Sequence, residues 1–201
     1  MYKCVFFDLF GTLADDDKGY DKFLVGLIDN KEKRKKFIDL WCIKRREWYK
    51  YKYSPFEDIL ERSFNEALKQ MEIYINKANC DFLEIFQNMP QFKEIENVLL
   101  KLKNRHKIGI LTNSNNDFLS CVLNNLQVKF DYIISAESIK VYKPHPASYL
   151  AMLQKSKLKK EDIMFVSCSG WDIDGAKKVG IANVFIDRKK GETLNKVLAC
   201  L

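Results

Sequence analysis

The sequence lacks any apolar stretch long enough to cross a membrane. Charged residues interrupt every hydrophobic run well short of the ~18 apolar residues that a membrane-spanning helix requires. The six cysteines form no CxxC pair, no histidine stands at zinc-ligand spacing from them, and no secretory signal precedes them. We therefore expect a cytoplasmic protein with reduced thiols and no membrane partner.

The sequence also lacks internal repeats, low-complexity segments, flexible Gly/Ser linkers and nucleic-acid-binding motifs. The 34 Lys and Arg against 27 Asp and Glu give a formal charge of +7, but the lysines are scattered, as in 31–36 and 155–160, without interleaved aromatic residues. This excess suits a small anionic substrate and a solvated surface, so we expect no nucleic-acid partner. The sequence is compatible with a homodimer.

Short apolar runs alternate with helical patterns over most of the chain. The runs cover 3–7, 108–111, 132–135, 163–167 and 183–186, and such alternation predicts a Rossmann-like parallel sheet flanked by helices, an α/β fold. Between about 15 and 89 the pattern becomes long, charged and amphipathic, with Pro55 beginning one of several expected helices. With 201 residues, we predict one core domain, 1–14 and 90–201, and an inserted helical cap domain, 15–89.

Polar residues follow the apolar runs at the points where the predicted strands end. They include Asp8, Thr112 with Asn113, the loop that carries Lys143, and the segment 167–172. In open parallel sheets the ligand lies beyond the carboxyl ends of the strands, so these residues should converge there. The predicted cap leaves the core just after the first strand and should cover the same edge.

Asp8 ends the first apolar run and is followed by Gly11 and Thr12. A lone aspartate at a strand end can be a simple turn or helix-cap residue. Here the glycine permits a tight turn and the threonine hydroxyl can donate a hydrogen bond to an anion. A carboxylate held in this way can attack an electrophile and form an ester that water cleaves.

Four ordered motifs make the chain resemble the haloacid dehalogenase superfamily. They are DLFGTL, LTNS, YKPHP and SCSGWDIDGA. The resemblance implies that Asp8 is the nucleophile, that Thr112 is the hydroxyl of the second motif, and that Lys143 neutralises the nucleophile and a bound anion. It implies that Asp172 orients this lysine or a water molecule.

Two departures from the superfamily's phosphatases point to the 2-haloacid dehalogenase branch. Phe10 stands where the phosphatases carry an acid, and Ser167-Cys168 stands where they carry a Gly-Asp pair that helps to bind magnesium. The segment 141–149 and the fourth motif are similar to those of the dehalogenases, whose halide departs without a metal or an acid. Implied substrate-site residues are Phe10, Tyr149, Ser167, Ser169 and Trp171.

The cap motif LWCIKRREW departs from the dehalogenases. In that branch an arginine at the position of Cys42 receives the departing halide. Arg45 or Arg46 lies about one helical turn further on and can replace it, since residues three or four apart share a helix face. The alternative is that both arginines are solvated and the activity has changed.

The sequence thus predicts a hydrolase that uses an aspartate nucleophile to cleave the carbon–halide bond of a small 2-haloacid, without a cofactor. Asp8, Lys143, Asp172 and Thr12 are the predicted catalytic residues, and Thr12, Thr112 and Asn113 are expected to position the substrate carboxylate. One alternative is a magnesium-dependent phosphatase in which Asp8, the Phe10 carbonyl and Asp172 hold the metal. Another is a non-catalytic binding protein that keeps the fold.

Overall fold

A computed structural model of the chain describes residues 2–75 and 80–201. Its centre is a parallel sheet of order β3-β2-β1-β4-β5. The strands are β1 (Cys4–Phe7), β2 (Lys107–Thr112), β3 (Tyr132–Ser135), β4 (Ile163–Ser167) and β5 (Ala182–Phe185). The prediction of a parallel α/β sheet is confirmed. Residue 1 of the predicted core and residues 76–79 of the predicted cap lie outside the described residues.

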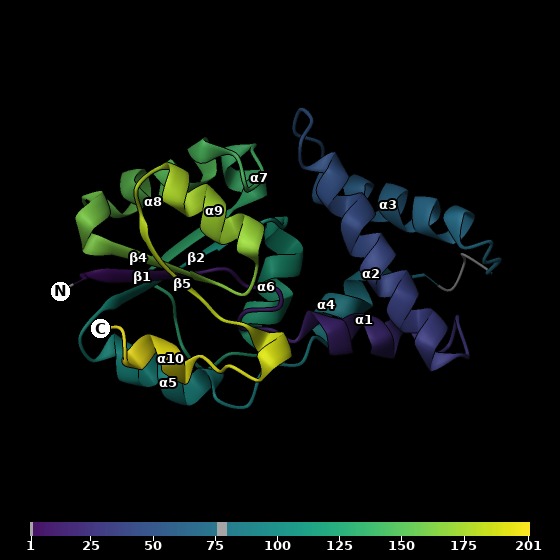
Figure 1. Ribbon diagram of the computed structural model, residues 1–201, viewed down its shortest axis with the longest axis horizontal. Helices are drawn as coiled ribbons and strands as arrows, with labels where there is room; N and C mark the ends of the chain where they lie inside the picture. Colours follow the sequence, from purple (N-terminus) through teal and green to yellow (C-terminus); the bar gives the residue numbers. More distant parts are fainter. Residues whose placement is uncertain (1, 76–79) are drawn as a thin grey trace.

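Helices cover both faces of this sheet (Figure 1). On one face lie α5 (Ile95–Lys103) and α10 (Asn195–Leu198), and on the other lie α8 (Pro146–Ser156) and α9 (Gly170–Lys178). The side chains of β1 pack on both faces of the sheet. Val5 and Phe7 lie in the same hydrophobic cluster as α5, and Cys4 and Phe6 lie in the same cluster as α8. This alternation explains why β1 is apolar throughout. The remaining core helices are α6 (Asn116–Asn124), α7 (Ala136–Ile139), η2 (Lys160–Asp162) and η3 (Arg188–Lys190).

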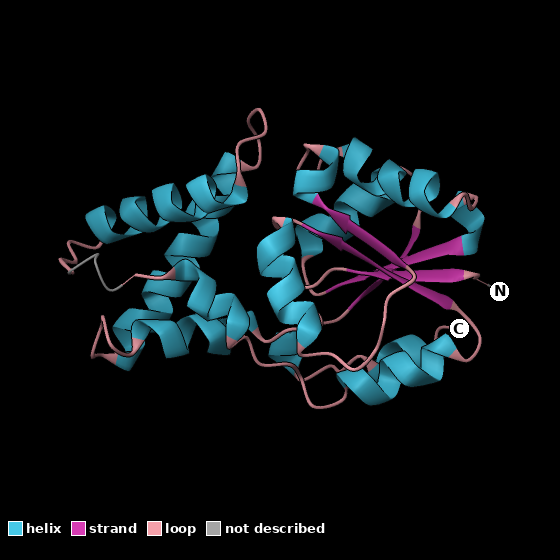
Figure 2. Cartoon of the chain, turned by 180° about the vertical axis from the view of Figure 1, so that it is seen from behind, coloured by secondary structure: helices cyan, strands magenta, loops and turns pink. Residues whose placement is uncertain are grey.

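In the described residues, four helices lie between β1 and the core helix α5, which leads back to the sheet at β2. They are α1 (Asp16–Leu24), α2 (Lys31–Trp48), α3 (Phe56–Gln70) and α4 (Phe82–Gln87). Figure 2 shows α2 and α3 projecting away from the sheet. They have an aromatic core of their own, in which the rings of Trp41 and Phe64 lie 5.0 Å apart and the Trp41 Nε1 donates to the Leu60 carbonyl oxygen at 3.1 Å. Helix α3 begins directly after Pro55, as predicted. Within the described segments, none of the helices combines the length and apolar character needed to span a bilayer.

A stack of three tyrosines joins these helices to the core. The ring of Tyr142 lies between those of Tyr49 and Tyr53, with centroid distances of 4.7 and 5.3 Å. The Tyr142 hydroxyl also donates to the carbonyl oxygen of Ser54 at 2.8 Å. Because Tyr142 directly precedes Lys143, the inserted helices pack against the loop that carries this lysine.

Candidate active site

Three charged side chains from distant parts of the sequence meet beyond the carboxyl ends of the strands. Asp8 follows β1, Lys143 lies in the loop before α8, and Asp172 lies in the first turn of α9. The Lys143 Nζ donates to Asp8 Oδ1 at 2.7 Å and to Asp172 Oδ2 at 2.6 Å. All three side chains are buried, so the ammonium group interacts with both carboxylates where water screens little of their attraction.

Burial and charge act in opposite directions on these groups. Burial disfavours the ammonium form of Lys143, but the adjacent Asp172 and Asp8 carboxylates outweigh it and raise the lysine pKa. For Asp172, burial is the largest effect and raises its pKa to about 6, with Asp8 adding to the rise and Lys143 opposing it. The lysine is therefore a fixed cation, and Asp172 can exchange a proton in a mildly acidic range.

Asp172 is held on its other side by two hydroxyl groups. Tyr149 of α8 donates to Asp172 Oδ1 at 3.0 Å, and the Ser167 hydroxyl donates to Oδ2 at 3.1 Å. Tyr149 is fully buried behind the carboxylate. Both hydroxyl groups orient Asp172, and the predicted contacts of Tyr149 and Ser167 with the substrate stay predictions. Ser169 precedes α9, is partly exposed, and donates its backbone N–H to the Ser167 hydroxyl at 3.0 Å.

Asn113 makes two hydrogen bonds to the backbone of Lys143. Its Nδ2 donates to the Lys143 carbonyl oxygen at 2.9 Å, and its Oδ1 accepts from the Lys143 N–H at 2.7 Å. These contacts hold the loop that carries Lys143, and substrate binding by Asn113 stays a prediction. The loop that carries Lys143 runs beside the end of β2 and needs partners for its buried backbone groups.

Thr12 connects the nucleophile to the fourth motif. Its Oγ1 donates to Asp8 Oδ2 at 2.9 Å and accepts from the Cys168 N–H at 3.0 Å. The turn between Asp8 and Thr12 contains Gly11 at φ +76°, a conformation that favours glycine. Phe10 packs its ring edge-on against Phe86 of α4, with the centroids 5.5 Å apart, so it adds apolar surface between the core and the inserted helices.

Two predicted substrate residues carry buried polar atoms without partners. The Oγ1 of Thr112 and the Nε1 of Trp171 have no hydrogen-bond partner among the described residues, and the same holds for the hydroxyl of Ser114. The Trp171 ring centroid lies 6.0 Å from the Lys143 Nζ. Leaving a buried donor unpaired costs about 1–3 kcal/mol, so such atoms beside a charged cluster are suited to hydrogen-bond a ligand.

The structure separates the two arginines proposed to replace the cation missing at Cys42. Arg46 is exposed, whereas Arg45 is only 8% exposed. Arg45 donates through Nη1 to the Tyr20 hydroxyl at 2.7 Å and through Nη2 to the Cys42 Sγ at 3.3 Å. No described carboxylate lies within ion-pair distance of its guanidinium. A buried cation without a counter-ion is unusual and marks a place suited to an anion.

Asp16 is a site residue that the sequence reasoning missed. It is the first residue of α1. Its carboxylate and the Cys168 thiol both lie beside Gly11: an ideal Cβ on this glycine would be 3.2 Å from Asp16 Oδ1 and 2.8 Å from Cys168 Sγ. Burial raises the pKa of Asp16 to about 7, and Asp17 and Asp8 add to this rise while Arg45 opposes it. In the sequence, Asp16 stands in a run of three aspartates at a helix start, where such residues are common caps, so no local signal separates it from its neighbours.

The residues at this site fit magnesium poorly. The ammonium of Lys143 already contacts both carboxylates that the phosphatase alternative requires, Asp8 and Asp172. At the position of a third acidic ligand, burial raises the pKa of the Cys168 thiol to about 12 and keeps it neutral. Magnesium prefers charged oxygen ligands in octahedral geometry, which a neutral thiol does not supply. Over residues 2–75 and 80–201, no cluster of three His, Cys, Asp or Glu side chains is spaced to hold a metal.

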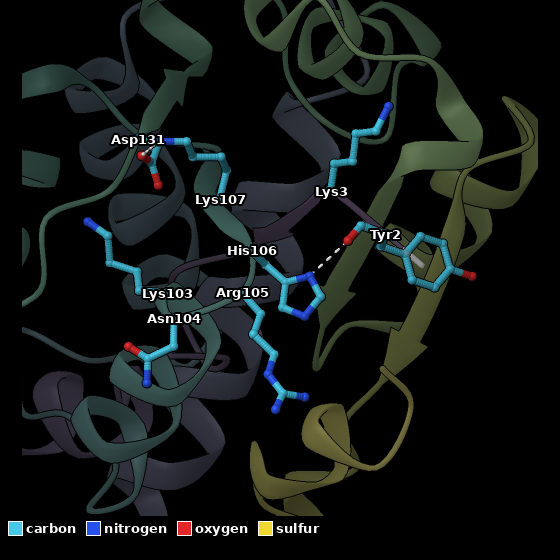
Figure 3. A pocket seen from close by; sticks show the side chains of 8 residues that line it. All are labelled: Tyr2, Lys3, Lys103, Asn104, Arg105, His106, Lys107 and Asp131. Carbon is cyan, nitrogen blue, oxygen red and sulfur yellow. Dashed lines mark hydrogen bonds and ion pairs between the residues drawn. The ribbon is translucent and has the colours of Figure 1, made fainter.

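A cavity lies at the amino ends of the strands, away from the Asp8 cluster. It measures about 500 Å³, and its lining includes Lys103, Arg105, His106 and Lys107 (Figure 3). Figure 3 shows that the His106 ring is bonded to the backbone of Tyr2, and the Nδ1 to oxygen distance is 2.8 Å. The basic side chains point in different directions around it. This cavity lies beside the amino ends of β1 and β2 and is separate from the Asp8 cluster.

Comparison with known proteins agrees with this arrangement. The family described as haloacid dehalogenase-like hydrolases matches residues 2–180. The chain is 28% identical over 200 residues to haloacetate dehalogenase H-2 of Moraxella sp. (strain B), covering 92% of this chain and 86% of that protein. It is 26% identical over 197 residues to (S)-2-haloacid dehalogenase of Pseudomonas sp. (strain YL), covering 92% and 83%.

The fold is also similar to a solved structure. The L-2-haloacid dehalogenase of Xanthobacter autotrophicus with chloropropionic acid covalently bound has a TM-score of 0.82 and 24% sequence identity to this chain. The match covers 94% of this chain and 78% of that one. At this identity the likeness concerns the fold, including the parallel sheet and the helices inserted after its first strand.

Proposed function

Because the chain belongs to the haloacid dehalogenase-like hydrolase family, we propose that it hydrolyses the carbon–halide bond of a small 2-haloacid through an ester on Asp8. Two relatives carry the names haloacetate dehalogenase and (S)-2-haloacid dehalogenase, which describe this reaction. The single observation that carries the proposal is the buried guanidinium of Arg45, which has no carboxylate partner among the described residues. A departing halide would supply the anion that this cation lacks.

In the first step an Asp8 oxygen attacks C2 of the substrate, and the carbon–halide bond breaks with its electron pair leaving on the halide. Lys143 and Thr12 each hold one oxygen of the attacking carboxylate, which fixes its direction. The substrate carboxylate receives hydrogen bonds from the unpartnered Thr112 hydroxyl and Trp171 Nε1. The halide departs toward Arg45, whose charge stabilises it.

In the second step a water molecule attacks the carbonyl carbon of the Asp8 ester. Asp172 accepts a proton from this water, and Tyr149 and Ser167 hold its carboxylate in place. The bond between the Asp8 carbonyl carbon and the ester oxygen then breaks, and the proton passes to the departing alkoxide. The second proton of the water leaves the Asp8 carboxyl group for solvent. The products are a 2-hydroxy acid, the regenerated Asp8 carboxylate and one proton, and no Lewis acid is required.

The test compares two reactions of the purified protein. We expect chloride release from racemic 2-chloropropionate, unchanged by EDTA, and no phosphate release from a generic aryl phosphate with added magnesium. Asp8→Asn serves as the matched inactive control for any contaminating enzyme. Phosphate release that EDTA abolishes and Asp8→Asn removes would instead establish the phosphatase alternative. If neither anion is released, the haloacid proposal is wrong.

A further inference from the structure

We propose that Asp16 donates a proton to the departing group, which extends the reaction to 2-fluoroacids, whose fluoride leaves less readily than chloride. This inference rests on the proposed function, because it assigns a second catalytic group to the same site. The expected dehalogenation chemistry does not use Asp16, since chloride departs unprotonated. A general acid accelerates a reaction only where charge on the leaving atom would otherwise block departure.

Contacts place Asp16 beside the nucleophile. The Asp16 Oδ1 and the Cys168 Sγ lie against the same point of the Gly11 backbone, 3.2 and 2.8 Å from the ideal Cβ position. The Cys168 N–H donates to Thr12 Oγ1, which in turn donates to Asp8. These contacts connect the Asp16 carboxylate to the nucleophile through Cys168 and Thr12.

Asp16 also lies one helical turn before Tyr20 on α1, and the Tyr20 hydroxyl accepts from Arg45 Nη1 at 2.7 Å. The Asp16 charge interacts with that of Arg45, the cation proposed to receive the leaving group, as well as with that of Asp8. Because a displaced group leaves on the side of the carbon opposite the attacking oxygen, it passes from the Asp8 side toward the Arg45 side.

The surroundings of Asp16 favour its protonated form near neutral pH. Burial and the nearby Asp17 and Asp8 raise its pKa to about 7, and the Arg45 charge opposes this only in part. The other titratable groups that respond to its charge are Tyr20 of α1, Cys42 of α2 and Cys168 before α9. Their own pKa values are raised by burial, so all three are neutral near pH 7 and leave the Asp16 proton in place.

The N-terminal cap of α1 is made by Asp15 and not by Asp16. Asp15 caps α1 by accepting from the Lys18 N–H at 3.2 Å and pairs with the Lys18 Nζ at 2.6 Å. The Asp16 carboxylate has no ion pair in the part of the chain that the structure describes, and its side chain is only partly buried by surface area. It can therefore be reached by a bound ligand.

Asp16 transfers its proton as the carbon–fluorine bond breaks. An Asp8 oxygen forms a bond to C2, the carbon–fluorine bond breaks, and its electron pair takes the Asp16 proton, giving hydrogen fluoride and the Asp16 carboxylate. When water later hydrolyses the Asp8 ester, the net proton from that water restores the Asp16 acid. Hydrogen fluoride then ionises in solvent, so the cycle consumes only water.

The experiment compares Asp16→Asn with Asp17→Asn, which makes the same substitution at the exposed neighbour. Release of fluoride from 2-fluoropropionate and of chloride from 2-chloropropionate is measured as kcat/KM across pH. In Asp16→Asn we expect fluoride release to fall ~100-fold or more and chloride release to fall less than ~3-fold, because an amide cannot give up a proton. Asp17→Asn should retain the wild-type ratio of the two rates at pH values where Asp16 keeps its proton in both proteins.

The pH profile separates proton donation from a structural role. Wild-type fluoride release should decline as the pH rises through about 7, where Asp16 loses its proton, and Asp17→Asn should move this decline to lower pH by removing a like charge. Equal losses of fluoride and chloride release in Asp16→Asn would refute the inference. So would wild-type chloride release without fluoride release, an outcome that leaves the proposed function intact.

The protonation state of Asp16 can also be measured without any enzymatic turnover. The infrared carbonyl band of a protonated carboxyl, taken as wild type minus Asp16→Asn, should be present below neutral pH and lost above it. Absence of the band overturns the inference. If wild type releases neither halide, the proposed function fails and the proton-donor role fails with it, whatever the band shows.

Discussion

Arg45→Gln should strongly slow chloride release, because this substitution removes the proposed halide-binding charge while keeping a side chain of similar length that can still donate. Arg45 is buried, so water screens little of its charge. A halide that pairs with it at about 4 Å would interact by about 4 kcal/mol at an effective dielectric constant of about 20, and its partly developed charge in the transition state would receive about 2–3 kcal/mol of this. The expected loss of kcat/KM is therefore ~30- to 150-fold.

Arg46→Gln is the matched control, because it removes the same charge from the exposed neighbour on the same helix. It should change kcat/KM for 2-chloropropionate less than ~2-fold, since water and salt screen an exposed charge. Thermal unfolding of both variants shows whether Arg45→Gln has damaged the packing around Tyr20 instead.

A rescue variant makes the reasoning sharper. Cys42 lies one helical turn before Arg45, with its Sγ 3.3 Å from Arg45 Nη2, so Cys42→Arg in the Arg45→Gln background returns a cation to the same place. We expect it to recover ~10-fold of the lost rate. Cys42→Arg alone should bring no gain, because two buried guanidinium groups would repel each other. The reasoning is refuted if Arg45→Gln and Arg46→Gln lose activity equally, or if a folded Arg45→Gln protein keeps the wild-type rate.

Three further predictions concern the charged cluster. Asp8→Asn should abolish chloride release while leaving the unfolding temperature nearly unchanged; activity that survives after mass spectrometry excludes deamidation would rule out the ester. Asn113→Leu should lower kcat ~10-fold and destabilise the fold by about 1–3 kcal/mol, because the buried Lys143 N–H loses its acceptor; unchanged unfolding and kcat would contradict the positioning role. Chloride release should fall as the pH drops through about 6, where the raised pKa of Asp172 leaves it protonated and unable to accept the water proton; a flat profile down to pH ~5 would contradict this.

The convergence of the charged cluster could be predicted because it depends on strand ends. Asp8 and Asp172 each follow a short apolar run, and the carboxyl ends of parallel strands share one edge of the sheet. The strands 132–135 and 163–167 have the bounds that the apolar runs indicated. The positions of these residues at the strand ends follow from the hydrophobic pattern and the strand topology, and both can be inferred from the sequence.

Side-chain direction could not be predicted in the same way. Arg45 and Arg46 are equivalent in sequence, and only the packing of α2 against Tyr20 turns one inward and the other to solvent. Asn113 could as well have faced a ligand as the backbone of Lys143, because the choice depends on where a loop 30 residues later runs. Asp16 was missed since its role depends on burial against the fourth motif, far away in sequence.

The central position of β1 has a consequence for the order in which the chain can fold during synthesis. Its partners β2 and β4 begin at Lys107 and Ile163, so the apolar strand made first must wait about 160 residues for its last neighbour. At ~5–20 residues per second the delay is roughly 8–30 s. Meanwhile α1, α2 and α3 can pack locally, because their contacts are close in sequence. Until β2 is made, a ribosome-bound chain would thus carry a folded helical segment beside an unpaired Cys4–Phe7 strand, which is the stretch that a chaperone would have most reason to shield.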